Sequence, residues 1–188
     1  MNISRTIALT ALSLVAGAAC SSTPTLSSGV DGNKNLSEIS TDEKKSLCEA
    51  LTKTGLDFQE SAKEGLCKFG GALAAAFAGG EAACDAAVKM CTEAPATVSQ
   101  TAADCEGSVD LSGCNATVEE LETCYNETLG ILADFYDELG GQSCGELLSS
   151  SGSGPTGTPP AEPEACKTLK SKCPNAPLPG STSTSTST

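Results

Sequence analysis

The stretch Thr117–Gly141, TVEELETCYNETLGILADFYDELGG, decides the fold class of this 188-residue chain. Apolar side chains recur in it every three or four residues, which is the period of one face of an α-helix. Thr117 and Glu120 have the spacing of a capping box, in which each side chain binds the other residue's backbone N–H. We therefore expect a long helix that stops at Gly140-Gly141, a favourable C-terminal signal. The apolar stripe consists of Val118, Leu121, Tyr125, Leu132, Phe135 and Leu139.

Two other segments carry helix signals of their own. Ser40 and Glu43 repeat the capping-box spacing, and apolar residues at Leu47 and Leu51 follow on one helical face. The segment Glu81–Thr92 is rich in alanine, the strongest helix former. No segment shows the alternation typical of a strand, so the sequence predicts an all-α fold.

A further apolar stripe lies between these two segments, with spacings of three and four residues. Gly70-Gly71 interrupts the stripe, where we expect a kink or a broken helix, and Gly79-Gly80 closes it. Its apolar stretch is too short to span a bilayer, which takes about 20 residues. The members of the stripe are Phe58, Ala62, Leu66, Phe69, Leu73 and Phe77.

The N-terminus has the pattern of an export signal. Met1–Arg5 is a short basic region, and the apolar run Ile7–Gly17 follows it. Small residues then lead directly into Cys20, which resembles the lipobox of bacterial lipoproteins. The resemblance implies that residues 1–19 are removed and that Cys20 carries the lipid. Cleavage after Ala18 is the alternative, and it would leave Cys20 near a free end.

The chain has 11 cysteines, an odd number. Assigning Cys20 to the lipid leaves ten, which can close five disulfides in an oxidising compartment. There is no Cys-x-x-Cys pair and no histidine, so the sequence predicts neither a metal site nor a cofactor. The predicted disulfide cysteines are Cys48, Cys67, Cys84, Cys91, Cys105, Cys114, Cys124, Cys144, Cys166 and Cys173.

Helix geometry excludes two of the possible bridges. Cys84 and Cys91 are seven residues apart on a predicted helix, so they lie about 10.5 Å apart along its axis. A disulfide requires Cα atoms within about 7 Å, and each should therefore bond to a different segment. Cys166 and Cys173 have the same spacing, and the same exclusion holds if their segment is helical.

Other pairings stay open at this level. Cys105 and Cys114 flank a loop that contains Gly107 and Gly113, so helix geometry does not exclude a local bridge between them. Sequence spacing does not choose among the remaining combinations.

Composition divides the chain into regions. We expect residues 20–39 to be a flexible polar tether and residues 40–149 to form the helical, disulfide-rich domain. A Ser/Gly/Pro-rich linker over 150–163 leads to a short helix at 164–174 that docks onto the domain. Residues 175–188 end in Ser-Thr repeats and should be disordered.

Charge and composition exclude several function classes. The formal net charge is −13, and the only arginine, Arg5, lies in the export signal, which excludes a nucleic-acid binder. Without histidine there is no Ser-His-Asp or Cys-His site, and a glycosidase would need aromatic platforms, whereas tryptophan is absent. We therefore expect no enzyme activity.

Some residues imitate functional motifs. The acids of Glu119–Glu122 fall in the first turns of a helix, where they stabilise its dipole. The run Asp31–Asn35 resembles the start of a calcium loop, but Leu36 stands where glycine is needed and Asp42 where glutamate is needed. Tripeptides of the N-glycosylation pattern, which arise often by chance, begin at Asn35, Asn115 and Asn126.

Three cysteine-containing runs carry a family resemblance: Leu47–Ala50, Cys114–Cys124 and Cys166–Pro174. With the lipobox, they resemble the cysteine-rich exported lipoproteins of myxobacteria and related bacteria. The resemblance implies a lipoprotein of the outer membrane that faces the periplasm or the cell surface, and it implies no reaction.

The sequence thus predicts a non-catalytic cell-envelope lipoprotein with a binding or structural role. Its expected partner is a membrane, reached through the N-terminal lipid, and its protein or ligand partner is open. The alternative is a secreted, extracellular helical carrier or effector that binds an apolar ligand between its helices.

Overall fold

The computed structural model describes residues 23–95, 111, 113–149 and 161–174. Within these ranges the chain is helical and contains no strand, only one isolated β-bridge between Asn35 and Thr117. The predicted all-α fold is therefore confirmed. The elements are η1 (Leu36–Glu38), α1 (Thr41–Ser61), α2 (Lys63–Ala78), α3 (Glu81–Glu93), α4 (Val118–Gly140), α5 (Cys144–Ser149) and α6 (Glu164–Lys172).

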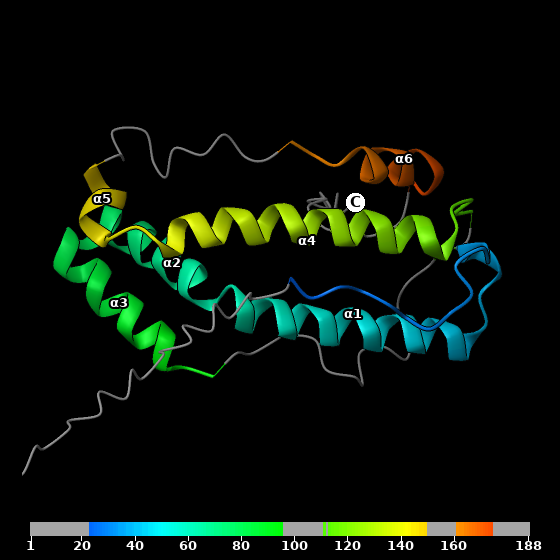
Figure 1. Cartoon of the computed structure of the whole chain (residues 1–188), viewed down its shortest axis with the longest axis horizontal. Coiled ribbons are helices and arrows are strands. Elements are labelled where there is room, and N and C mark those ends of the chain that lie inside the picture. The colour runs from blue at the N-terminus through cyan, green and yellow to red at the C-terminus, as the bar shows by residue number, and fades with distance from the viewer. Residues whose placement is uncertain (1–22, 96–110, 112, 150–160, 175–188) are drawn as a thin grey trace, which may run out of the picture.

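The longest helix, α4, runs along most of the molecule (Figure 1). On one side of it α1 and α2 follow one another along the body, and on another side α6 packs against its N-terminal half. At the far end, α3 and α5 pack against α2. The result is a bundle in which α2 and α4 form the common packing surface.

Both predicted capping boxes are present. The Ser40 hydroxyl accepts the Glu43 N–H, and Thr117 accepts that of Glu120, while each glutamate returns to the cap backbone. The predicted glycine terminus is also found, because α2 ends before Gly79, whose φ of 145° suits glycine.

The predicted interruption at Gly70-Gly71 is wrong. The helix breaks eight residues earlier, at Ala62 between α1 and α2, and both glycines lie inside α2. A Cβ on Gly71 would lie 2.9 Å from Val88 Cγ2 and 3.0 Å from the Cys84 carbonyl oxygen. Gly71 therefore serves the close approach of α2 and α3. The apolar stripe also predicted a buried position for Leu73, but its side chain is exposed.

The short helix α5 was not predicted. Ser143 precedes it and forms a capping pair with Glu146, since the Glu146 N–H donates to the Ser143 hydroxyl and the Ser143 N–H donates back to the carboxylate. The spacing Ser-x-x-Glu is the same signal that identified α1 and α4. Applied here, it would have found this helix.

Four described disulfides hold the helices together, and half-cystines fill part of the core. Cys67, Cys84 and Cys124 are each at most 2% exposed. They occupy positions that large side chains would take in a domain richer in aromatic residues. The bonds and their Cα–Cα distances are Cys67–Cys91 (5.5 Å), Cys84–Cys144 (5.9 Å), Cys114–Cys173 (4.2 Å) and Cys124–Cys166 (4.7 Å).

The predicted exclusions are confirmed. Cys84 bonds to α5 and Cys91 to α2, so α3 is joined to two different helices. Cys166 and Cys173 also avoid each other, and both connect the α6 segment to the start of α4 or the loop before it.

The possible local bridge between Cys105 and Cys114 is wrong, because Cys114 bonds to Cys173. The physical reason is that α6 lies directly beside the turn that precedes α4. Cys105 itself lies outside the described residues. Cys48 is disulfide-bonded as well, and its partner is not among the described cysteines, which pair with one another.

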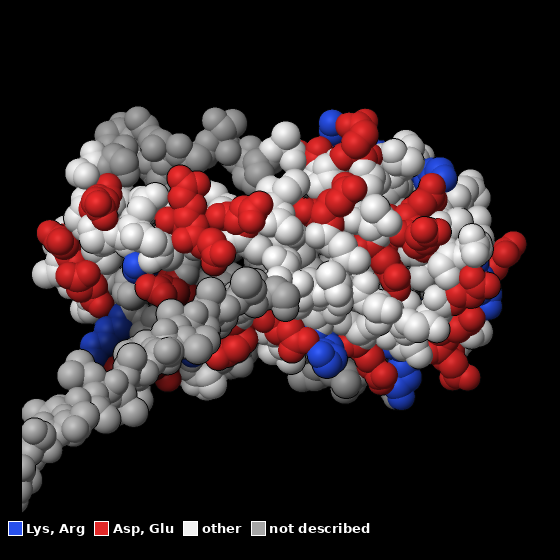
Figure 2. Space-filling model, in the orientation of Figure 1, with Lys and Arg blue, Asp and Glu red and all other residues white. Residues whose placement is uncertain are grey.

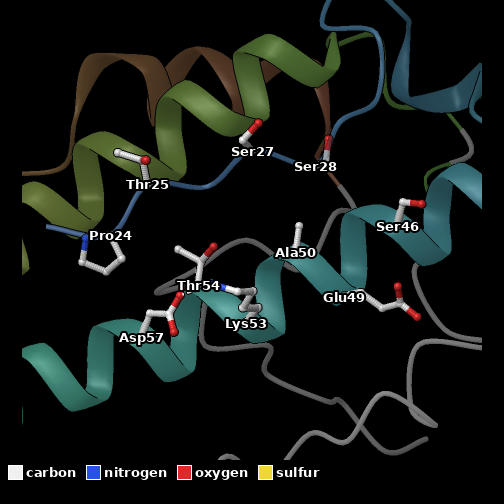
Figure 3. A pocket seen from close by; sticks show the side chains of 10 residues that line it. All are labelled: Pro24, Thr25, Ser27, Ser28, Ser46, Glu49, Ala50, Lys53, Thr54 and Asp57. Carbon is white, nitrogen blue, oxygen red and sulfur yellow. Dashed lines mark hydrogen bonds and ion pairs between the residues drawn. The ribbon is translucent and has the colours of Figure 1, made fainter.

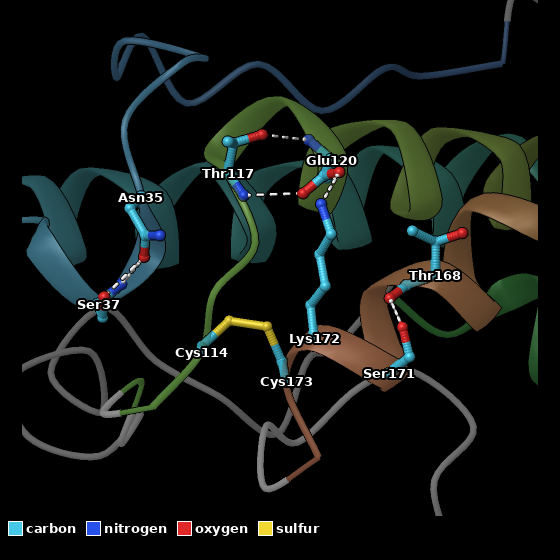
Figure 4. The surroundings of a disulfide bond; sticks show 9 residues. All are labelled: Asn35, Ser37, Cys114, Thr117, Glu120, Thr168, Ser171, Lys172 and Cys173. Carbon is cyan, nitrogen blue, oxygen red and sulfur yellow. Dashed lines mark hydrogen bonds and ion pairs between the residues drawn. A yellow bond between two sulfur atoms is a disulfide. The ribbon is translucent and has the colours of Figure 1, made fainter.

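Figure 4 shows how α6 is held at this end. Next to the Cys114–Cys173 disulfide, the Lys172 ammonium donates to the Glu120 carboxylate. The Asn115 N–H donates to the Lys172 carbonyl at 3.0 Å. A covalent bond, an ion pair and a backbone hydrogen bond thus dock α6, as expected from the spacing of Cys166 and Cys173.

The predicted flexible tether is wrong for residues 23–39. This segment lies between α1 and α4, and it buries Leu26 and Leu36, which are 2% and 1% exposed. The Leu36 N–H donates to the Ala116 carbonyl at 2.8 Å. The apolar residues of this segment follow no helix or strand period, so the sequence did not predict that the segment packs against the helices. The folded body begins by Thr23, not at residue 40.

Candidate functional site

The predicted lipid attachment residue, Cys20, lies outside the described residues. It precedes Thr23, the first described residue, by three positions. Three residues span at most about 11 Å when fully extended. Any group attached to Cys20 is therefore held close to the body.

The acids near the start of α4 have structural partners. Glu120 completes the cap and accepts from Lys172, and these two hydrogen bonds, that from Lys172 first, lower the pKa of Glu120. Glu122 accepts from both the backbone N–H and the hydroxyl of Ser28, at 2.7 and 2.6 Å. The helix-start interpretation is confirmed for Glu120, and Glu122 fixes the N-terminal segment.

The calcium-like run is also occupied by local hydrogen bonds. Asp31 Oδ1 accepts the Asn33 N–H, and Asn35 Oδ1 accepts the N–H and hydroxyl of Ser37. Within the described ranges, no three or more of the ligand-forming side chains cluster in a way that could hold a metal ion. These residues shape the turn before η1.

The side chain of Asn126 contacts the backbone of Leu26 at two points. Its Oδ1 accepts the Leu26 N–H at 2.6 Å, and its Nδ2 donates to the Leu26 carbonyl at 3.2 Å. Asn126 therefore acts like a neighbouring strand for this residue. The asparagine of this glycosylation-type tripeptide therefore makes a structural contact.

A groove of about 560 Å³ lies between residues 24–28 and α1 (Figure 3). One wall is the N-terminal segment, with Thr25 and Ser27 at its rim. The other wall is formed by α1, with Ala50 and Thr54 toward the segment. Hydroxyl and charged side chains form most of the lining: Pro24, Thr25, Ser27, Ser28, Ser46, Glu49, Ala50, Lys53, Thr54 and Asp57.

Two rows of α1 residues line this wall, each with a spacing of four. Ser46, Ala50 and Thr54 form the row of small side chains. In the charged row, Lys53 pairs with Asp57 at 2.6 Å. No sequence argument singled out this groove, because its second wall was expected to be a flexible tether. The four-residue spacing of small residues was the one available signal.

Acidic side chains are spread over the visible face of the molecule, with few basic ones between them (Figure 2). One basic residue, Lys34, is paired with an acid, since its ammonium donates to Glu43 at 2.7 and 2.8 Å. This hydrogen bond, with those from Ser40, lowers the pKa of Glu43 to about 2. Glu43 therefore stays ionised in a mildly acidic or neutral medium.

No described helix combines the length and apolar character needed to cross a membrane. No protein-family model, no curated protein and no solved structure matches this chain. Function must therefore be inferred from the residues themselves.

Proposed function

We propose that the protein is a non-catalytic lipoprotein of the cell envelope, anchored through a lipid on Cys20, whose helical body binds a partner next to the membrane. The single observation that carries the proposal is the position of the folded segment. Pro24 and Thr25 already line the groove beside α1, a few residues after the lipobox-like residues that end at Cys20.

The disulfides support the proposal that the protein lies in an oxidising compartment. Bonds that join α2 to α3, α3 to α5 and α6 to α4 are compatible with an oxidising environment, such as the envelope or the extracellular space. An outer-membrane location, facing the periplasm or the cell surface, is the finer proposal. It rests on the lipobox resemblance.

The anchor also sets the orientation of the body. With at most about 11 Å of chain between Cys20 and Thr23, the groove wall formed by residues 24–28 stays next to the bilayer surface. A long tether would instead let the body move freely above the membrane. The proposed protein therefore acts at the membrane surface.

The alternative, a secreted carrier of an apolar ligand, gains no support from the groove. Its lining consists mainly of hydroxyl and charged groups, and an apolar ligand would leave these groups without hydrogen bonds. The half-buried apolar residues around Phe58 and Leu129 pack against one another inside the core. The anchored binding module remains the proposal.

Detergent phase partitioning tests the anchor. The wild-type protein, expressed in a bacterium that processes lipoproteins, should enter the detergent phase, and Cys20→Ser should move to the aqueous phase. Ser22→Ala is the matched control and should partition like the wild type. A Cys20→Ser protein that still enters the detergent phase would refute the anchor.

A further inference from the structure

We infer that the groove between residues 24–28 and α1 binds a short extended peptide with a basic side chain, which pairs with the N-terminal segment as an added strand. The inference goes beyond the proposed envelope role, and it holds whether or not Cys20 carries a lipid. Four observations support it: a free backbone edge, a hydroxyl without a partner among the described residues, an unpaired carboxylate and the length of the groove.

The first observation concerns the backbone of the N-terminal segment. The N–H groups of Leu26 and Ser28, and the carbonyl of Leu26, all bond to side chains of α4. In an extended chain, alternate residues turn their backbone groups to opposite sides. Thr25 and Ser27 therefore turn theirs away from α4, and both residues line the groove.

Among the described residues, no hydrogen bond reaches the backbone groups of Thr25 or Ser27. Such an edge is the surface that β-augmentation uses: a peptide adds as a strand, its backbone gives the affinity and its side chains give the specificity. Here α4 occupies one side of the segment, and the groove keeps the other side open.

The second observation is the hydroxyl of Thr54 on the opposite wall. Thr54 is 6% exposed, and its hydroxyl has no hydrogen bond among the described residues. Elsewhere in the chain, Thr92, Thr128 and Thr168 donate to the carbonyl four residues earlier in their own helix. Thr54 does not make this bond.

No fully buried side-chain N or O atom of the described residues lacks a partner. The unpartnered Thr54 hydroxyl must therefore open onto the groove that it lines. Because the hydroxyl is open to the groove, it can form a hydrogen bond with a polar group of a ligand that lies there.

The third observation is charge. Lys53 is neutralised by Asp57 at 2.6 Å, whereas Glu49, one turn earlier, has no ion pair or hydrogen bond within the described chain. The groove therefore presents one uncompensated negative charge, on a protein of net charge −13. A lysine or arginine of the peptide would pair with Glu49.

The fourth observation is length. The row from Ser46 to Thr54 spans about 12 Å along α1 at 1.5 Å per residue. An extended peptide rises about 3.3 Å per residue, so three to four residues fit beside it. The chain's own C-terminal tail is a poor match, because no basic residue follows Lys172. The expected occupant is a basic extended segment of another protein.

Titration of the oxidised mature protein with the peptide acetyl-Ala-Lys-Ala-Thr-amide tests the inference. We expect saturable binding by calorimetry, with NMR shifts at Thr25, Ser27 and Thr54. Methylating the backbone nitrogens of the peptide should weaken binding at least tenfold, since it removes the strand hydrogen bonds. Replacing its lysine by glutamine should weaken binding at least fivefold.

Variants of the protein provide the second part of the binding test. Thr54→Val, which keeps the shape and removes the hydroxyl, and Glu49→Gln should each weaken binding at least fivefold. Glu60→Gln is the matched control, because Glu60 is exposed on α1 and does not line the groove. Should Thr54→Val fail to fold, the modified peptides on the wild-type protein still decide the question.

Three results would overturn the inference. The first is no saturable binding of the peptide, and the second is equal binding of its N-methylated form. The third is saturation of the groove by an N-acetylglucosamine oligomer and not by the peptide, which would make it a sugar site. The Cys20→Ser protein should bind the peptide like the wild type, so failure of the anchor and failure of the groove remain distinguishable.

Discussion

Two glycines of α2 let neighbouring helices approach more closely than any other residue would allow. A Cβ on Gly65 would lie 2.0 Å from the Tyr136 carbonyl oxygen of α4, and one on Gly71 would contact Val88 of α3. In contrast, a Cβ on Gly70 would have no neighbour within 4 Å. Adjacent glycines of one helix thus have different roles.

These glycines give a matched pair of substitutions. Gly65→Ala should lower the free energy of unfolding by about 1–3 kcal/mol, because α2 and α4 must separate to admit the methyl group. Gly70→Ala should raise it by up to about 1 kcal/mol, because alanine is the better helix former. Urea denaturation of the oxidised proteins measures both, and equal stabilities would contradict the packing role of Gly65.

At the scale of the helices, three glutamates lie at capped N-termini: Glu43, Glu120 and Glu146. Each has a pKa below its ordinary value of 4.5, and that of Glu43 is about 2. The largest cause is a hydrogen bond from Lys34 for Glu43, from Lys172 for Glu120 and from the Ser143 backbone for Glu146. All three helices therefore depend on ionised carboxylates.

This dependence fixes the sign of the acid response. A carboxylate with a lowered pKa in the folded state adds stability above its unfolded pKa, and the protein loses this stability as the pH falls through the folded pKa. The urea concentration at the midpoint of unfolding should therefore decrease as the pH is lowered from 4.5 to about 2. Glu43→Gln should show a shallower decline in this window, while Glu60→Gln, which removes a charge that caps no helix, should follow the wild type.

At the scale of the whole molecule, each end of the bundle has its own pair of described disulfides. At one end Cys67–Cys91 and Cys84–Cys144 join α2, α3 and α5, and at the other Cys114–Cys173 and Cys124–Cys166 hold α6. An isolated helix as short as α6 would not be stable in water. The bridges therefore maintain the architecture as well as its stability.

Peptide mapping without reduction should recover these four bridges. It should also find Cys48 joined to Cys105, because Cys48 is disulfide-bonded and Cys20 is assigned to the lipid. Each bridge should contribute about 2–4 kcal/mol, so reduction should unfold the domain at moderate temperature. A Cys48–Cys20 bridge, or two or more free thiols in the unreduced protein, would contradict this assignment.

The sequence by itself determined the helical class and most helix boundaries. Capping boxes, glycine ends and apolar periods act over about four residues, so Ser40, Thr117 and Gly79 could be recognised without knowing the rest of the fold. The same local geometry excluded a bond between Cys84 and Cys91. The helix α5 carried this signal too, at Ser143.

Only the tertiary structure decided which distant segments meet. The pairing of Cys114 with Cys173 and the packing of Leu26 against α4 join segments that are far apart in the chain. No local period encodes such contacts, because they follow from the shapes of two surfaces at once. The groove beside Thr54 exists for the same reason: it forms between α1 and a segment whose irregular apolar residues gave no sign of packing.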